Sequence, residues 1–330
     1  MRWATIDTYL NNVYNIIGMN TIKGRSDYRS HARRNTALKA ILVFLAVIVV
    51  IGVPLFLLAV PWYRKSAERK ELLSVWNKRD YAAVYSMSKA ALETKPMDYF
   101  MLTTCGFSAF QLGISQINSQ DTLRYMDDCI FYLRKALLLK EAENDGQVSY
   151  VLGKAYYYKG DDYAEEAVKY LENARYLSYN AADIPEFLGL AFSSLRDYRS
   201  SVEAFSQALS PERGEPSDLL LLSMARSYIA LGEPDSARAY LLRCIEMSLD
   251  SKTSVTARLV LAEILAKAGN TQEAENQYLT ILENYGNIAE AHYQLGELYS
   301  KRGDVVRARS EWRLALRADS THKKASERLR

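Results

Sequence analysis

Large and small residues recur along the C-terminal half of this chain with a period of 34 positions. Counting from Ala289, large side chains stand at positions 7, 11 and 24, and small residues stand at positions 8, 20 and 27. The pattern also holds from Val255, 34 residues earlier, apart from Ile281 at position 27. In the later copy these six positions hold Leu295, Tyr299, Trp312, Gly296, Ala308 and Ala315. A fixed period of this length indicates a repeated supersecondary unit.

The same register continues toward the N-terminus. Further copies begin at Asp218, at Ala182 and at Gly146, the last with two extra residues in its turn, and a looser copy begins at Tyr99. The stretch Asp80–Pro96 fits the second helix of one more, degenerate copy. These positions resemble those of the tetratricopeptide-repeat family, in which each repeat is a pair of antiparallel helices. The resemblance implies an all-α solenoid of about six to seven helix pairs that binds other proteins.

Each position of the repeat has a physical role. Small residues at positions 8, 20 and 27 allow two helices to cross closely, and large residues at positions 7, 11 and 24 fill the space between helices. Glycine at position 15 lets the chain leave the first helix in a left-handed conformation. Asp or Asn at position 16 caps the second helix. By this logic the acidic pair Asp161 and Asp162, after Gly160, is predicted to cap a helix rather than to bind a metal.

A second feature is the stretch Ala40–Val60, which contains 21 residues without a charge. At about 1.5 Å per residue, a helix of this length crosses the hydrocarbon core of a bilayer. Trp62 and Tyr63 follow at the expected place for interfacial aromatics. The segment is too long and starts too far into the chain to be a cleaved signal peptide. We therefore expect one retained transmembrane helix over residues 38–63.

The predicted layout has five parts. A basic tail with a short amphipathic helix (1–37) precedes the transmembrane helix (38–63), degenerate repeat or linker helices (64–98), the repeat array (99–322) and a polar capping tail (323–330). Basic residues flank both ends of the span, so the positive-inside rule gives no orientation. A single uncleaved span behind a short tail favours a cytoplasmic N-terminus and a periplasmic array at the inner (cytoplasmic) membrane. The reverse orientation stays open.

Charge separates the tail from the array. Residues 1–39 hold seven Lys or Arg and two Asp or Glu, whereas the remainder holds 35 and 37. A near-neutral array does not suit nucleic acid, so we expect no nucleic-acid partner. In the tail an apolar helical stripe contains Trp3, Ile6, Leu10, Val13 and Ile17. This stripe fits a helix on the membrane surface, a helix docked on a partner, or a short helix without a special role.

The sequence contains no recognisable catalytic, redox or metal-binding motif. The three His residues lie far apart in sequence, and Cys105, Cys129 and Cys244 fit neither a disulfide framework nor a zinc or redox pair. No glycine-rich phosphate loop or nucleophile elbow is present. We therefore predict that the protein is not an enzyme and that it uses no cofactor, no metal and no catalytic residue.

The resemblance also implies where a partner binds. In the tetratricopeptide family the first helix of each repeat lines a concave groove, with positions 2, 5, 9, 12 and 13 pointing inward. Carried over by register, the predicted partner-binding residues are Phe107, Phe110, Tyr150, Lys154, Tyr157, Tyr158, Arg226, Glu263, Tyr293 and Glu297. The aromatic part suits an apolar or extended segment, and the mixed-charge part can orient it. No Asn stands at position 9, so the chaperone-tail ligand of one subclass is not expected.

These observations predict a bacterial membrane-anchored scaffold for assembly of an envelope-associated complex, acting through protein partners and in a homo- or hetero-oligomer. In architecture the chain resembles the membrane-anchored repeat proteins of the spirochaete periplasmic flagellar collar. Two alternatives remain: a chaperone-like accessory of the protein translocon or of envelope biogenesis, and a cytoplasm-facing recruiter of soluble proteins.

Overall fold

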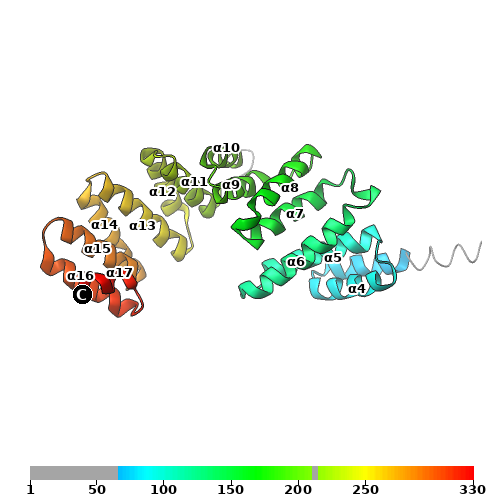
Figure 1. Cartoon of the computed structure of the whole chain (residues 1–330), viewed down its shortest axis with the longest axis horizontal. Helices are drawn as coiled ribbons and strands as arrows, with labels where there is room; N and C mark the ends of the chain where they lie inside the picture. Colours follow the sequence, from blue (N-terminus) through cyan, green and yellow to red (C-terminus); the bar gives the residue numbers. More distant parts are fainter. Residues whose placement is uncertain (1–65, 210–214) are drawn as a thin grey trace, which may run out of the picture. The chain divides into compact units, whose positions relative to one another are not determined.

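Every regular element that the structure describes is helical. The computed structural model describes residues 66–209 and 215–330 (Figure 1). Within those residues no helix is both long enough and apolar enough to cross a bilayer. The predicted transmembrane helix (38–63) and the predicted amphipathic tail (1–37) lie outside the described residues. The chain divides into two compact units, residues 1–74 and 75–330, and the described part of the first unit, residues 66–74, is helical.

The second unit is a succession of antiparallel helix pairs (Figure 1). It begins with the end of the helix that covers residues 66–77, followed by α4 (Tyr81–Thr94). The pairs that follow are α5 (Tyr99–Ile114) with α6 (Ser119–Ala136), α7 (Gly146–Lys159) with α8 (Ala164–Tyr176), and α9 (Ile184–Ser194) with α10 (Tyr198–Ala208). Then come α11 (Asp218–Ala230) with α12 (Pro234–Met247), α13 (Ser251–Lys267) with α14 (Thr271–Tyr285), and α15 (Ala289–Lys301) with α16 (Val305–Ala318). The last helix is α17 (Lys323–Leu329), and short 3-10 turns stand at Lys140–Ala142 (η2) and Asp161–Tyr163 (η3).

Each helix packs mainly against its neighbours in the chain. In addition, α5 contacts α7, α7 contacts α9, α9 contacts α11, and α11 contacts α13. The first helices of successive pairs therefore lie next to one another along this part of the array. We call the surface formed by α5, α7, α9, α11, α13 and α15 the first-helix face. Because the pairs bury their apolar sides only on one another, stability comes from stacking of neighbours.

The close helix crossing predicted at position 8 is confirmed. A Cβ atom added at position 8 would lie within 2.6 Å of the position-24 side chain of the same pair in four of the repeats. The four pairs of residues are Gly106 with Leu133, Gly153 with Leu171, Gly189 with Phe205, and Gly296 with Trp312. A Cβ contact below 3.0 Å forces something to shift. In these four repeats the side chain at position 24 therefore leaves no room for a Cβ atom at position 8.

The turn between the two helices of a pair follows the predicted chemistry in most copies. Gly232, Gly269 and Gly303 adopt φ angles of 78°, 85° and 82°, the left-handed region that glycine enters without strain. The carboxylate of Asp304 accepts a hydrogen bond from the backbone N–H of Arg307, which caps α16. Asp80 and Asp197 cap α4 and α10 in the same way. The side chain of Asn270 makes no capping hydrogen bond, contrary to the expectation for that position.

Candidate functional site

The ten predicted groove residues lie on the first helices. They differ in how far they are exposed and in whether the chain itself already contacts them. Phe110 is buried, with 4% of its surface exposed, and Phe107 packs with it in the core formed by α5, α6 and α7. These two rings therefore contribute to the stability of the array more than to its surface. The other eight residues fall into four places along the first-helix face.

The first place is a group of residues around the ammonium of Lys154, which we call the Lys154 cluster: Phe110, Tyr150, Lys154, Asp183 and Phe187. The Nζ atom of Lys154 lies 2.7 Å from Oδ2 of Asp183 and donates to the hydroxyl of Tyr150 at 3.0 Å. It also stands 4.3 Å from the ring centre of Phe187 and 5.7 Å from that of Phe110. The Lys154 side chain is only 14% exposed. Lys154 is thus held inside the chain by a carboxylate and by aromatic faces.

Tyr150 belongs to the same network. Its hydroxyl donates to the Asp183 carboxylate, with distances of 2.8 and 2.9 Å to the two oxygens. Burial, followed by the hydrogen bond to Asp183 and the charge of that residue, raises the pKa of Tyr150 well above its usual value. The hydroxyl therefore remains a donor at any physiological pH. The network joins α7 to the N-terminus of α9.

Asp183 and Phe187 were missing from the predicted set. Asp183 stands at position 2 of the copy that begins at Ala182, so the inward positions of the register include it. Phe187 stands at position 6, which the register does not assign to the groove, yet its ring packs against those of Tyr157 and Tyr158 at centroid distances of 5.3 and 6.0 Å. The available signal was the inward register position for Asp183 and the aromatic character of the neighbouring sequence for Phe187.

The second place is the C-terminal end of the face, which the chain covers itself. Arg328 of α17 forms two hydrogen bonds to the carboxylate of Glu297, at 2.8 and 2.6 Å. The ring of His322 lies 5.1 Å from that of Tyr293, which is 8% exposed. Residues 323–329, predicted as part of a polar capping tail, thus form a helix over two of the predicted groove residues. A partner that contacts Tyr293 has to displace α17.

The third place is an apolar hollow of about 440 Å³ between α11 and α13, which includes Glu263 at its rim. The carboxylate of Glu263 forms an exposed ion pair with Lys267, at 2.7 Å. The residues that line the hollow are Ile229, Gly232, Pro234, Val260, Glu263, Ile264, Lys267 and Ala268. Apart from the ion pair at its rim, the lining is apolar.

The fourth place is a depression of about 430 Å³ between α7, α9 and α11, which we call the Arg226 depression. Its lining residues are Tyr157, Tyr158, Asp161, Leu190, Ser193, Ser194, Leu219, Ser223 and Arg226. Three of the predicted groove residues therefore come together here: Tyr157, Tyr158 and Arg226. Tyr158 is 39% exposed and Leu219 is 48% exposed, so large apolar surface faces solvent.

The polar groups in the Arg226 depression differ in whether they already have hydrogen-bond partners. Arg226 is exposed, and its guanidinium has no hydrogen bond or ion pair to any residue within 66–209 and 215–330. Asp161, predicted to cap a helix, does not do so because η3 follows it; its carboxylate instead accepts a hydrogen bond from the Ser194 hydroxyl at 2.6 Å. Burial is the largest cause that raises the pKa of Tyr157 and of Tyr158, and the carboxylate of Glu186 adds to both shifts. Both phenols therefore stay protonated and can donate.

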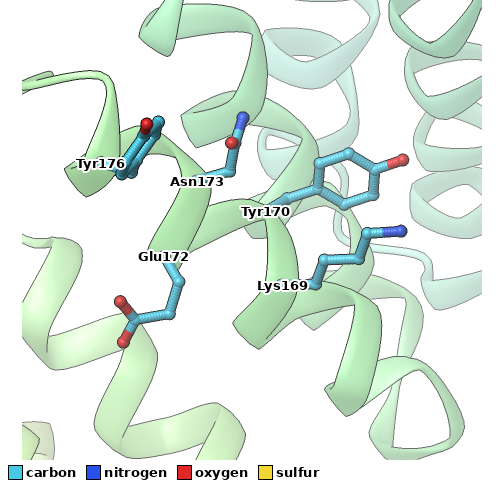
Figure 2. Close-up of a pocket in the computed structure, with 5 residues that line it drawn as sticks. All are labelled: Lys169, Tyr170, Glu172, Asn173 and Tyr176. Carbon is cyan, nitrogen blue, oxygen red and sulfur yellow. The ribbon is translucent and has the colours of Figure 1, made fainter.

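A larger but different depression, of about 600 Å³, lies along α8. All five residues that line it come from this one helix: Lys169, Tyr170, Glu172, Asn173 and Tyr176. Figure 2 shows that their side chains do not converge, since Lys169 and Tyr170 point to one side of the helix and Glu172 to the other. This surface is shallow and none of the predicted site residues lies on it.

A metal-ligand cluster or a reactive cysteine thiol would be a possible site of chemistry among the described residues. Among residues 66–209 and 215–330 no set of three or more His, Cys, Asp or Glu side chains is placed to hold a metal ion. All three cysteines are buried, and burial raises the pKa of Cys105 and of Cys244 to about 11. A thiol with such a pKa is a poor nucleophile at neutral pH.

Comparison with known proteins supports the predicted family. The family model for the tetratricopeptide repeat matches residues 222–287 and 259–322. The C-terminal part of a tetratricopeptide-repeat protein from Cytophaga hutchinsonii has a similar structure, with a TM-score of 0.59 and 15% identity over 79% of this chain and 99% of that one. A tetratricopeptide-repeat protein from Parabacteroides merdae aligns with a TM-score of 0.50 and 17% identity over 80% and 98% of the two chains. No curated protein matches the sequence.

The predicted fold is therefore confirmed for the array: it is an all-α tetratricopeptide-repeat solenoid. Repeats of this kind suggest a protein-interaction scaffold, and the fold is typically non-catalytic. At identities this low, the similar structures establish the fold and do not identify a partner.

Proposed function

We propose that this chain, whose array has the tetratricopeptide-repeat fold, is a membrane-anchored scaffold that holds a segment of a partner protein on its first-helix face. The Arg226 depression carries this proposal. Three predicted groove residues converge there, beside exposed Leu219 and Tyr158, and the Arg226 guanidinium has no ion pair or hydrogen bond to any residue within 66–209 and 215–330. Exposed apolar surface next to an unpaired charge is typical of a site that binds another protein.

The proposal predicts site-specific cross-linking. A photoreactive phenylalanine derivative at Leu219 should form a discrete cross-linked adduct in cells, because this position is 48% exposed and faces the depression. The same derivative at Tyr176, which is 84% exposed and belongs to α8 and not to the first-helix face, serves as the matched control. The adducts are measured by a mass shift on gels and identified by mass spectrometry.

Labelling confined to Leu219 supports docking on the first-helix face. Equal labelling at both positions, or at Tyr176 alone, contradicts the proposal, because both side chains are accessible and only their location differs. A single adduct of defined mass indicates a scaffold with a specific partner. A broad distribution of adducts instead supports a chaperone-like accessory, which contacts many clients.

We further propose that residues 38–63 anchor the scaffold in the inner membrane of a bacterium, with the array in the periplasm and the partner in an envelope-associated assembly of the flagellar-collar kind. The support is the uncharged stretch Ala40–Val60, followed by Trp62 and Tyr63, ahead of the array.

Two reporters fused after Arg330 test this topology. Alkaline phosphatase, which is active only outside the cytoplasm, should be active, and a green fluorescent protein, which folds poorly when exported through the general secretory route, should be dark. The opposite result places the array in the cytoplasm and leaves a recruiter of soluble proteins as the function. A chain with the stretch Ala40–Val60 deleted is the control, since both reporters should then behave as cytoplasmic.

A further inference from the structure

We infer that the partner segment carries an acidic residue and a large apolar residue within four positions of each other, and that these two side chains enter the hollows on either side of α11. The carboxylate pairs with Arg226, and the apolar side chain fills the hollow lined by Ile229, Val260 and Ile264. This inference rests on the docking function proposed above and specifies the chemistry of the segment that binds.

The two hollows are adjacent because α11 contributes to both. Arg226 lines the depression toward α9, and Ile229 lines the hollow toward α13. Residues three apart lie on neighbouring positions of one helix surface, separated by a rise of about 4.5 Å. A bound segment therefore has to cross only the ridge of α11. Side chains two apart in an extended segment, spaced by about 7 Å, or three to four apart in a helical one, reach both hollows.

The hydrogen-bonding capacity that remains around Arg226 favours an acid over a base. The carboxylate of Asp161 already accepts from the Ser194 hydroxyl, and that of Glu186 accepts from the Ser217 hydroxyl at 2.8 Å. Arg226 has no such partner within the described residues. A carboxylate suits the planar guanidinium because it can accept two parallel hydrogen bonds. The protonated phenols of Tyr157 and Tyr158 line the same depression and can donate to an acidic side chain as well.

The hollow toward α13 favours an apolar side chain. Ile229, Val260 and Ile264 are partly buried by the core of the array, and each keeps a share of its surface for the hollow. A volume of about 440 Å³ exceeds the roughly 30 Å³ that one water molecule occupies in the liquid, so a large side chain can enter. Glu263 and Lys267 pair with each other at the rim and leave the floor apolar. Burial of apolar surface supplies affinity, and the Arg226 ion pair supplies register.

A displayed library of random ten-residue peptides, selected on the full-length chain in detergent micelles, tests the inference. We expect the enriched peptides to contain Asp or Glu within four positions of Leu, Ile, Phe, Met or Trp. Binding of the synthetic peptides is then measured by fluorescence anisotropy.

The variant Arg226→Glu should weaken peptide binding by about tenfold or more and remove most of its salt dependence. Arg243→Glu, the same charge reversal at an exposed position of α12, should leave binding unchanged.

Two further variants complete the test. Ala268→Trp is expected to fill the apolar hollow from its rim and to weaken binding, while the exposure of Ala268 keeps the fold intact as judged by circular dichroism. A peptide with its acidic residue changed to lysine should bind Arg226→Glu more tightly than it binds the unaltered chain.

The outcomes separate this inference from the docking function. If peptides are enriched but bind Arg226→Glu and Ala268→Trp as well as the unaltered chain, docking stands and the acidic–apolar preference is wrong. If the enriched peptides are basic and lose binding in Asp161→Asn, the charge preference is the reverse of the one inferred. If no peptide is enriched over micelles alone, the docking function itself is contradicted.

Discussion

Replacing Gly296 with leucine is expected to lower the free energy of unfolding of the array by about 3 kcal/mol. A Cβ atom at this position would lie 2.5 Å from Nε1 of Trp312 and 3.1 Å from the backbone oxygen of Ala308. The indole is rigid and the carbonyl belongs to α16, so neither can move without shifting the helix. The gain in helix propensity over glycine, about 0.8 kcal/mol, offsets only part of this cost. Urea unfolding followed by circular dichroism measures the change.

The control is Ser300→Leu, which introduces the same side chain at an exposed position of α15 and should change the stability by less than about 0.5 kcal/mol. A second variant tests the cause directly. Combining Gly296→Ala with Trp312→Leu removes the clash from the other side, so the pair should be more stable than the sum of the two single changes predicts. An unchanged unfolding curve for Gly296→Leu would show that the two helices are not in close contact at position 8.

The same contact explains why much of the fold could be predicted from sequence. Packing between the two helices of a repeat depends on a glycine and a large residue at fixed positions of the register, such as Gly296 and Trp312, and four copies repeat this contact. A copy with a weak signal is therefore identified by its neighbours. The helix caps are predictable for the same reason, since Asp304 and Asp197 cap their helices at one fixed position of the repeat. Asn270 departs from that rule because an amide at the right position does not by itself form the hydrogen bond.

The site was less predictable because its contacts are not periodic. The register places Lys154 at an inward position, but the carboxylate that pairs with it belongs to Asp183, 29 residues away. No repeat position carries that pairing in other copies. Likewise, α17 has one fully buried apolar residue, Ala325, so its seven residues show no apolar stripe that would predict a helix docked over Tyr293. The predicted set lies on the first helices, but the register could not separate its exposed residues from those that the chain itself buries or pairs.

Removing the Asp183 carboxylate, in Asp183→Ala, is expected to cost about 3 kcal/mol of stability. The change leaves the Lys154 ammonium, only 14% exposed, without a counter-charge among aromatic rings, and it leaves the Tyr150 hydroxyl without its acceptor. The face of Phe187, 4.3 Å from Nζ, retains part of the interaction with the charge. Lys154→Met alone should cost less, because Asp183 is 34% exposed to water and still accepts from Tyr150.

The double variant Lys154→Met with Asp183→Ala distinguishes an internal contact from a surface charge. If the pair stabilises the joint between α7 and α9, the double variant should recover about 2 kcal/mol relative to Asp183→Ala, because no unpaired buried charge remains. The exposed pair Glu263 and Lys267, at 52% and 71% exposure, should show a coupling of less than about 0.5 kcal/mol in the same analysis. Strictly additive losses at Lys154 and Asp183 would contradict the assignment.

Substitution of Lys154 also tests how the array binds a partner. Lys154 is paired with Asp183, whereas Arg226 has no partner among the residues that the structure describes. Lys154→Met should therefore leave cross-linking from Leu219 unchanged, and Arg226→Glu should reduce it. Loss of the adduct in Lys154→Met, with native stability retained, would mean that a partner competes with Asp183 for the ammonium. In that case the Lys154 cluster would open on binding, and the partner's carboxylate would take the place that Asp183 holds in the free chain.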